Sequence, residues 1–175
     1  MRSDRELIEA INTGDADAFE QLYHRHRDWV YRLAWRFTAN HEDALDVLQE
    51  TFAYLLTKFP GFELTASVTT FLYPAVRHLA LNVRRRKSSR HGGDEALHDI
   101  PISESPPTSR SELAAALGVL SVEQREVVLM RFVDGLALSE ISVALDIPLN
   151  TARSRLYNAL RSLRDDPRTR DYFLD

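Results

Sequence analysis

The stretch from Gly135 to Arg164 constrains the fold most, because it contains two apolar stripes at helical spacing with a short corner between them. The corner lies at Ile147 and Pro148. The two stripes consist of Ile141, Ala144, Leu145, Ala152, Leu156, Ala159, Leu160 and Leu163. Spacings of three and four residues indicate helices that each bury one face. Two helices joined by so tight a corner are typical of a helix-turn-helix.

The second helix of this stretch keeps polar and basic side chains off its apolar stripe, and it contains no acidic residue before Asp165. Arg, Asn and Ser can hydrogen-bond base edges in the major groove, while Thr or Arg can hold phosphates. We therefore predict DNA contacts at Asn150, Thr151, Arg153, Ser154, Arg155, Tyr157, Asn158 and Arg161. The alternative is an ordinary solvated face on a small helical bundle.

The composition argues against several other classes of protein. The chain has 175 residues with 44% hydrophobic and 27% charged residues, which is typical of soluble globular proteins. It has no cysteine, and its six histidines are scattered, so we predict neither a metal site nor a cofactor. No apolar run approaches the ~18 residues that a spanning helix needs. The start, MRSDRELIEA, does not resemble a signal peptide. We expect a cytoplasmic protein without membrane insertion.

The net charge of −4 conceals a segregation of the two signs along the chain. Acidic residues gather between Glu42 and Glu50 and between Asp94 and Glu104. Basic residues gather between Arg77 and Arg90 and in the last helix. Local charge, rather than the total, decides whether a surface attracts nucleic acid. The segregation therefore predicts two kinds of partner, one a basic protein surface and the other a nucleic acid.

The rest of the chain has helical periodicity with capping residues at the expected helix starts. Asp4 to Asn12 predicts a short helix closed by a turn at Gly14. Two further helices are predicted after the caps Asp15 and Asn40, and a short one from Arg110 to Leu117. Ser121 to Gln124 fits an S-x-x-Q capping box, which predicts the start of another helix that ends at Gly135. We see no strand pattern and no internal repeat.

The segment Ser88 to Ser109 contains paired glycines, paired prolines and several serines, with hardly any apolar run. Such a composition is typical of an interdomain linker. The sequence therefore predicts an all-α fold of two small helical domains joined by a flexible linker. The expected bounds are 1–90 for the first domain, 91–109 for the linker, and 110–175 for the second domain, which holds the helix-turn-helix and ends in a short acidic tail.

Within the first domain, the segment DALDVLQETFAYLL (Asp43 to Leu56) predicts an amphipathic helix. Its expected inner stripe consists of Leu45, Leu48, Phe52 and Leu55 or Leu56. Asp46, Gln49 and Glu50 remain together on the other side. Their spacing is compatible both with a solvated acidic face and with a docking surface for a basic protein helix.

A loop and a basic helix are expected next. Pro60 to Thr70 has turn residues and hydroxyls but no periodicity, which predicts a loop. Phe71 to Lys87 then predicts a helix with a strongly basic C-terminal end. Pro74 removes a backbone hydrogen bond and clashes one turn back, so we expect the helix either to begin within a residue or two of Phe71 or to kink.

Taken in order, these segments resemble the extracytoplasmic-function (ECF) sigma factors of bacterial RNA polymerase. DALDVLQETF is similar to the core-binding helix of the family, usually close to DAEDLVQETF. FLYPAVRHLALNVRRRK is similar to the promoter-melting helix, and LSVEQREVVLMRFVDGLALSEISVALDIPLNTARSRLYNALRSL to the C-terminal helix-turn-helix. Asp146 and Asn150 replace glycines that the family usually has; Asp tolerates a left-handed backbone, and Asn150 is expected to cap its helix.

The resemblance implies a specificity subunit that is not an enzyme and that initiates transcription at chosen promoters. It assigns core-polymerase binding to Asp46, Gln49 and Glu50, and minus-35 recognition to the DNA contacts predicted above. It assigns minus-10 recognition and melting to Glu63, Thr69, Thr70, Arg77, Asn82, Arg84, Arg85, Arg86 and Lys87. The implied partners are promoter DNA, the clamp region of the largest polymerase subunit, the flap region of the second largest, and an anti-sigma factor.

Other classes of protein explain less of the sequence. A helix-turn-helix regulator that acts without polymerase accounts for the C-terminal half but leaves DALDVLQETF and the basic helix without a purpose. A helical adaptor without nucleic acid leaves the charge of Arg84 to Lys87 unexplained. An enzyme is the least favoured, since no paired carboxylates, nucleophile with a base, or phosphate loop occurs at a workable spacing.

Overall fold

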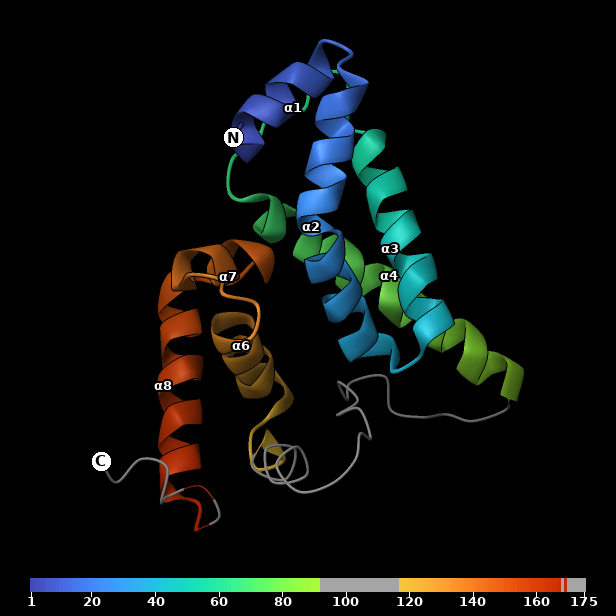
Figure 1. Cartoon of the computed structure of the whole chain (residues 1–175). Helices are drawn as coiled ribbons and strands as arrows, with labels where there is room; N and C mark the ends of the chain where they lie inside the picture. The colour runs from blue at the N-terminus through green and yellow to red at the C-terminus, as the bar shows by residue number, and fades with distance from the viewer. Residues whose placement is uncertain (92–116, 168, 170–175) are drawn as a thin grey trace. The chain divides into compact units, whose positions relative to one another are not determined.

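The computed structural model describes residues 1–91, 117–167 and 169, and within these residues the chain is helical without a strand (Figure 1). It divides into two compact units, Met1–Leu97 and His98–Asp175. The expected linker over 91–109 and the short helix from Arg110 lie almost wholly outside the described residues, as does most of the expected acidic tail.

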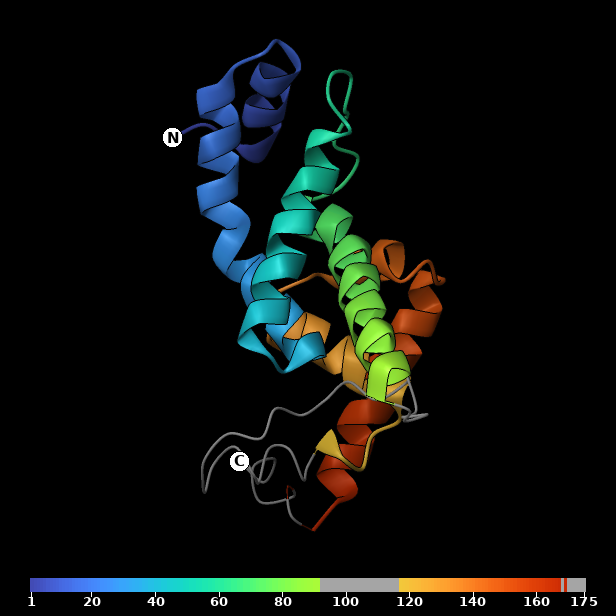
Figure 2. The same cartoon turned by 90° about the vertical axis from the view of Figure 1, so that its right-hand side faces the viewer.

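The N-terminal unit is built from four helices, α1 (Asp4–Asn12), α2 (Ala16–Thr38), α3 (His41–Leu56) and α4 (Val68–His91). Helices α2, α3 and α4 pack against one another, and α1 packs against α2 (Figures 1 and 2). The core between them is formed by fully buried side chains, including Leu22, Val30, Leu33, Phe37, Val47, Leu55, Leu72, Tyr73 and Val76.

Three of the helix starts predicted from capping residues are confirmed. Asp15 and Asn40 each accept a hydrogen bond at 3.0 Å from a backbone N–H in the first turn of the helix that follows. Ser121 and Gln124 form the predicted capping box: Ser121 Oγ accepts from the Gln124 N–H at 3.2 Å, and Gln124 Oε1 accepts from the Ser121 N–H at 3.1 Å. Each cap satisfies a first-turn donor that would otherwise lack a partner within the helix.

The start of α4 differs from the expectation. The helix begins at Val68, three residues before Phe71, because Ser67 caps it: Ser67 Oγ accepts a hydrogen bond from the Thr70 N–H at 3.2 Å. The predicted loop is therefore shorter than Pro60 to Thr70. Pro74 lies in the second turn of α4, where it cannot donate the backbone hydrogen bond that other residues would make.

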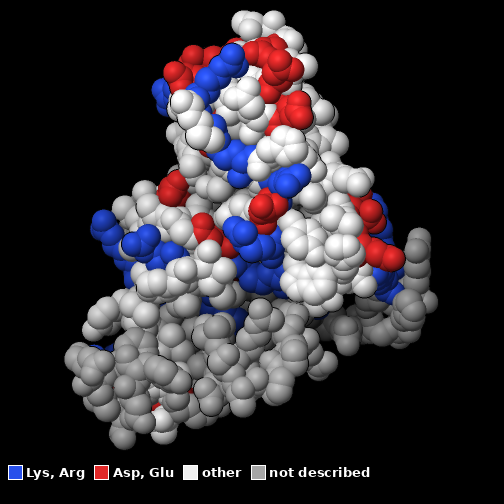
Figure 3. All heavy atoms as spheres, viewed as in Figure 1, with Lys and Arg blue, Asp and Glu red and all other residues white. Residues whose placement is uncertain are grey.

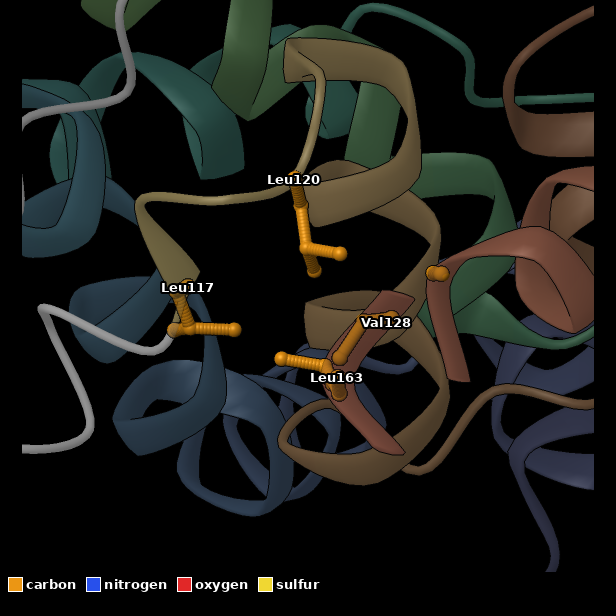
Figure 4. Packing of buried hydrophobic residues seen from close by; sticks show 5 residues of the cluster. Leu117, Leu120, Val128 and Leu163 are labelled. Atoms are coloured by element: carbon orange, nitrogen blue, oxygen red, sulfur yellow. The ribbon is translucent and has the colours of Figure 1, made fainter. Parts of the chain in front are cut away.

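The C-terminal unit contains α6 (Val122–Phe132), α7 (Leu138–Ala144) and α8 (Leu149–Asp165), and α8 packs against both of the others. Leu117, Leu120, Val128 and Leu163 point toward one another and, with Ala159, form a buried cluster (Figure 4). This cluster joins the segment before α6 to the last turns of α8. The predicted helix-turn-helix is confirmed as α7 and α8.

The corner between α7 and α8 has the backbone that the sequence predicted. Asp146 has φ +52°, so it occupies the left-handed region where the family usually has glycine. Ser142 Oγ donates a hydrogen bond to the Ile147 carbonyl at 2.6 Å and closes the corner. The expectation that Asn150 caps α8 is wrong, because α8 begins at Leu149 and its capping position is Pro148.

One apolar side chain expected to face inward is instead exposed. Leu45 on α3 retains 36% of its accessible surface. It lies at the edge of the helical stripe, where spacing alone does not say whether a neighbouring helix covers the side chain. Of the two alternatives considered for the last turn of α3, Leu55 is buried and Leu56 is exposed.

Candidate protein-docking and nucleic-acid surfaces

The outer side of α3 forms what we call the acidic face, comprising Asp46, Gln49 and Glu50. All three side chains are exposed, because the opposite stripe of α3 is buried against α2 and α4. Figure 3 shows carboxylate side chains at the edge of the N-terminal unit where α3 lies. Exposed Leu45 and Leu56 lie on the same helix. The surface therefore combines negative charge with apolar area, which suits a basic amphipathic partner better than a purely polar face would.

Asp43, one turn before the acidic face, is buried and does not belong to it. Its Oδ2 atom lies 2.6 Å from Lys87 Nζ near the end of α4, and the Asp43 side chain is 11% exposed. Lys87 follows buried Ala80 by seven residues, which is two helical turns, so it lies on the side of α4 that faces α3. This ion pair therefore attaches the basic end of α4 to the start of α3.

The loop before α4 presents some of the predicted minus-10 residues and hides others. Glu63 and Thr65 are exposed, and Thr69 is half-buried. Thr70 is 2% exposed, and its hydroxyl lies 2.7 Å from Ser67 Oγ. Thr70 therefore belongs to the packing at the start of α4 rather than to the accessible surface of the loop.

The basic residues of α4 do not share one face. Helical spacing places Arg77 and Arg84 together, Arg85 about a quarter turn away, and Arg86 on the far side. Arg77 and Arg84 are half-buried, whereas Arg85 and Arg86 are exposed. The end of α4 therefore carries positive charge around its circumference. Such a distribution suits the curved phosphate backbone of a separated strand.

An outward stripe on α4 includes a residue that sequence reasoning did not select. His78 is exposed, one turn before half-buried Asn82, and a ring nitrogen of His78 lies 3.3 Å from Asn82 Nδ2. Phe71 and Arg85 lie seven residues, or about two helical turns, before and after His78, so they belong to the same stripe. The signal for His78 was its spacing of four from Asn82, which becomes informative only once the buried side of α4 is known.

Helix α8 presents the residues predicted to contact DNA. Asn150, Arg153, Ser154, Tyr157, Asn158 and Arg161 are exposed, and Thr151 and Arg155 are half-buried. Ala152, Ala159 and Leu163 are buried on the opposite side. Basic side chains gather over the N-terminal end of α8 (Figure 3). The helix therefore has one anchored side and one accessible polar side.

Contacts within α8 distinguish its two ends. Arg153 Nη1 donates a weak hydrogen bond to Asn150 Oδ1 at 3.4 Å, so the two side chains point the same way from adjacent turns. Arg161 Nε lies 3.7 Å from the carboxylate of Asp165 in the last turn. The start of α8 is therefore basic and polar, while its end is partly neutralised.

The described residues contain neither a metal-binding cluster nor a membrane-spanning helix. Within residues 1–91 and 117–167, no three His, Asp or Glu side chains gather as a metal site would require. Among the helices that the structure describes, none combines the length and apolar composition of a membrane-spanning segment.

Comparison with known families matches both units of the chain. Residues 22–90 match the model of Sigma-70 region 2, and residues 110–163 match that of Sigma-70, region 4. The first match includes the acidic face, the loop and most of α4. The second includes α6, α7 and nearly all of α8.

Two mycobacterial proteins are similar along most of the chain. The ECF RNA polymerase sigma factor SigM of Mycobacterium tuberculosis is 31% identical over 161 residues, which cover 90% of this chain and 81% of SigM. The ECF RNA polymerase sigma factor SigE of Mycolicibacterium smegmatis is 32% identical over 165 residues, which cover 87% of this chain. The present chain spans 64% of the length of that SigE.

Two solved structures share the fold. One is CnrH in complex with the cytosolic domain of CnrY, with a TM-score of 0.67 and 22% identity over 91% of this chain and 94% of that one. The other is the sigma factor RpoE in complex with the anti-sigma factor NepR from Bartonella quintana, with a TM-score of 0.64 and 18% identity over 84% of this chain and 94% of that one.

Proposed function

The chain belongs to the ECF sigma factors of bacterial RNA polymerase, and we propose that it directs core polymerase to a specific set of promoters and initiates transcription there. One observation carries the proposal. A single chain exposes an acidic and apolar face on α3 of one unit and a basic, polar face on α8 of the other. A protein that must hold both a polymerase and a promoter needs two such surfaces.

We assign the acidic face to the clamp region of the largest polymerase subunit. Asp46, Gln49 and Glu50 offer charge and hydrogen bonds, and exposed Leu45 and Leu56 add apolar area to the same helix. Opposite charge steers association, and the burial of apolar surface stabilises the complex. The C-terminal unit is assigned to the flap region of the second largest subunit.

We assign promoter DNA to three surfaces. Exposed polar residues of α8 read the minus-35 element, with Asn150, Arg153 and Tyr157 toward the base edges. Exposed Glu63 in the loop and the outward stripe of α4 receive the minus-10 element. Arg85 and Arg86 hold the backbone of the separated strand, where positive charge is most effective. Thr69, Arg77 and Arg84 are assigned to the same element, so seven of the nine residues predicted for minus-10 recognition are kept, while Thr70 and Lys87 are engaged in the contacts described above.

The proposed role is that of a cytoplasmic specificity factor, not of an enzyme. The proposed domain bounds remain 1–90 for the polymerase-binding and minus-10 domain, 91–109 for the linker and 110–175 for the minus-35 domain. We further propose that an anti-sigma factor controls the chain by covering these surfaces. Among proteins of the same fold, RpoE is solved in complex with the anti-sigma factor NepR, and CnrH in complex with the cytosolic domain of CnrY.

Transcription in vitro tests this function directly. The purified chain is added to core polymerase with pooled genomic DNA, and transcript starts are mapped. We expect a discrete set of starts that share an upstream and a downstream element and that disappear when the chain is omitted. A gel shift on the same promoters provides the contrast: tight specific binding without core polymerase, together with no stimulated transcription, would instead identify a conventional helix-turn-helix regulator.

A further inference from the structure

The side chain of Asn12, the last residue of α1, holds the loop between α3 and α4 in place. Asn12 Oδ1 accepts hydrogen bonds from the backbone N–H groups of Gly61 at 2.7 Å and Phe62 at 3.0 Å. Asn12 Nδ2 donates to the carbonyl of Phe62 at 2.9 Å. The amide therefore pairs with the loop backbone in both directions, across about fifty residues of sequence. Figure 2 shows the loop extending from α3 alongside α1.

Helix α1 is itself rigidly attached to α2, which makes Asn12 a fixed reference point. Asp4 accepts from Arg25 Nη1 at 2.5 Å, and its other carboxylate oxygen lies 2.8 Å from His26 Nε2. Leu7 and Ile8 are buried against the unit at 0% and 2% exposure. The position of the loop is therefore tied through α1 to the helix that forms the centre of the N-terminal unit.

The hydrogen bonds of Asn12 also position an aromatic row. The ring of Phe62 lies 4.7 Å from that of Phe71 at the start of α4, and the Phe71 ring stacks on Tyr54 of α3 at 6.1 Å with 11° between their planes. At the other end of the loop, Ser67 caps α4. The loop is therefore held at Phe62 and at Ser67, and residues 63–66 lie between these two points, with Glu63 and Thr65 exposed.

We propose that Asn12 is a positioning residue that sets the conformation of residues 63–66 and thereby the base preference at the minus-10 element. The inference rests on the proposed function of the loop. Asn12 lies before residue 22, where the match to Sigma-70 region 2 begins. A short segment with both ends fixed samples few conformations, so it presents its exposed side chains in one arrangement. When one end is released, the same side chains remain but their arrangement is no longer defined.

The test is promoter selection by reconstituted holoenzyme from a library with a randomised minus-10 element. Asn12→Ala removes all three loop hydrogen bonds, and Asn12→Asp retains the two acceptor bonds but loses the donor. Thr13→Ala is the matched control, because the Thr13 hydroxyl bonds only the Ala10 carbonyl in the described structure and lies at the same end of α1. We expect the enrichment of the preferred base to fall about tenfold with Asn12→Ala, less with Asn12→Asp, and not at all with Thr13→Ala.

The possible outcomes separate the inference from the function on which it rests. If the wild-type holoenzyme selects a motif and both Asn12 variants select the same one with equal strength, Asn12 has no positioning role. If the wild-type chain selects nothing with core polymerase, the proposed function fails and the inference fails with it. Should Asn12→Ala not fold, promoter selection by Asn12→Asp alone decides, since a weaker minus-10 base preference than that of the wild type supports the inference and an unchanged preference overturns it.

Discussion

Arg153 is the residue of α8 best placed to read a base. It is exposed in the second turn, beside Asn150, and a guanidinium can donate to both major-groove acceptors of guanine. We expect Arg153→Ala to cost ~1–3 kcal/mol in promoter binding and to relax preference at one minus-35 base pair. Arg161 lies near the end of α8 beside Asp165. Arg161→Ala should weaken binding to all sequences alike. Selection of promoter variants with each mutant holoenzyme distinguishes the two, and an unchanged motif for Arg153→Ala would remove that residue from direct readout.

Asp15 gives the fold a pH dependence whose sign follows from its contacts. A hydrogen bond from Arg2 and another from the Ala18 backbone N–H lower the pKa of Asp15 below its ordinary value of 3.8. A carboxylate of this kind stabilises the fold above its unfolded pKa, and the contribution is lost as pH falls through the lower folded pKa. We expect the melting temperature to decline below about pH 4. Asp15→Ser retains a capping oxygen without a titrating group, so its decline should be shallower; equal slopes would exclude Asp15 as a source.

At the scale of elements, the ion pair between Asp43 and Lys87 determines how the end of α4 is held. Lys87→Met leaves the buried carboxylate of Asp43 without its cation, which destabilises the fold. Since the Lys87 side chain is 51% exposed, solvent screens the pair and we expect a loss of about 1 kcal/mol in the free energy of unfolding. Replacement of both residues, Asp43→Asn with Lys87→Met, should cost less than the sum of the single changes. Denaturant unfolding measures all three, and strict additivity would show that the pair is not coupled.

The exposed arginines at the end of α4 should act on strand opening. Each lost phosphate contact lowers the slope of log K against log[salt] by about 0.7–0.9. The loss of DNA affinity in the double variant Arg85→Ala with Arg86→Ala should therefore be largest at low salt. It should also be smaller on a premelted template, where the strands are already separated. Arg27→Ala with Arg32→Ala, both exposed on α2, is the control with the same charge change. Open-complex lifetimes decide: an equal defect on duplex and premelted templates would mean that Arg85 and Arg86 hold DNA without assisting its opening.

At the scale of the whole molecule, the acidic face must join this chain to a much larger partner. We expect Asp46→Lys with Glu50→Lys to abolish co-elution with core polymerase while changing the free energy of unfolding by under ~0.5 kcal/mol per site, as is usual for exposed positions. Glu9→Lys with Glu20→Lys makes the same charge change at exposed positions on α1 and α2 and should leave co-elution intact. Retained co-elution of the Asp46 and Glu50 double variant would contradict the assignment of this face.

Much of the architecture could be predicted from local signals. The caps at Asp15, Asn40 and Ser121 lie within three residues of the N–H groups they bond, so their effect is visible in the sequence. The start of α4 was missed although Ser67 is also a local cap. The hydroxyl-rich context around Ser67 offered several candidates, and the aperiodic composition of the segment favoured a loop.

By itself the sequence determined most of the helices, the caps at Asp15, Asn40 and Ser121, the helix-turn-helix and the separation of acidic from basic segments, because each of these depends on residues within a few turns of one another. Only the tertiary structure decided which charges are available to a partner. Asp43 and Asp46 are three residues apart, yet one is buried against Lys87 and the other is exposed, since α4 covers one side of α3 and not the other. The hold of Asn12 on Gly61 and Phe62 likewise depends on how α1 packs against the unit, and helical spacing carries no information about a contact of that range.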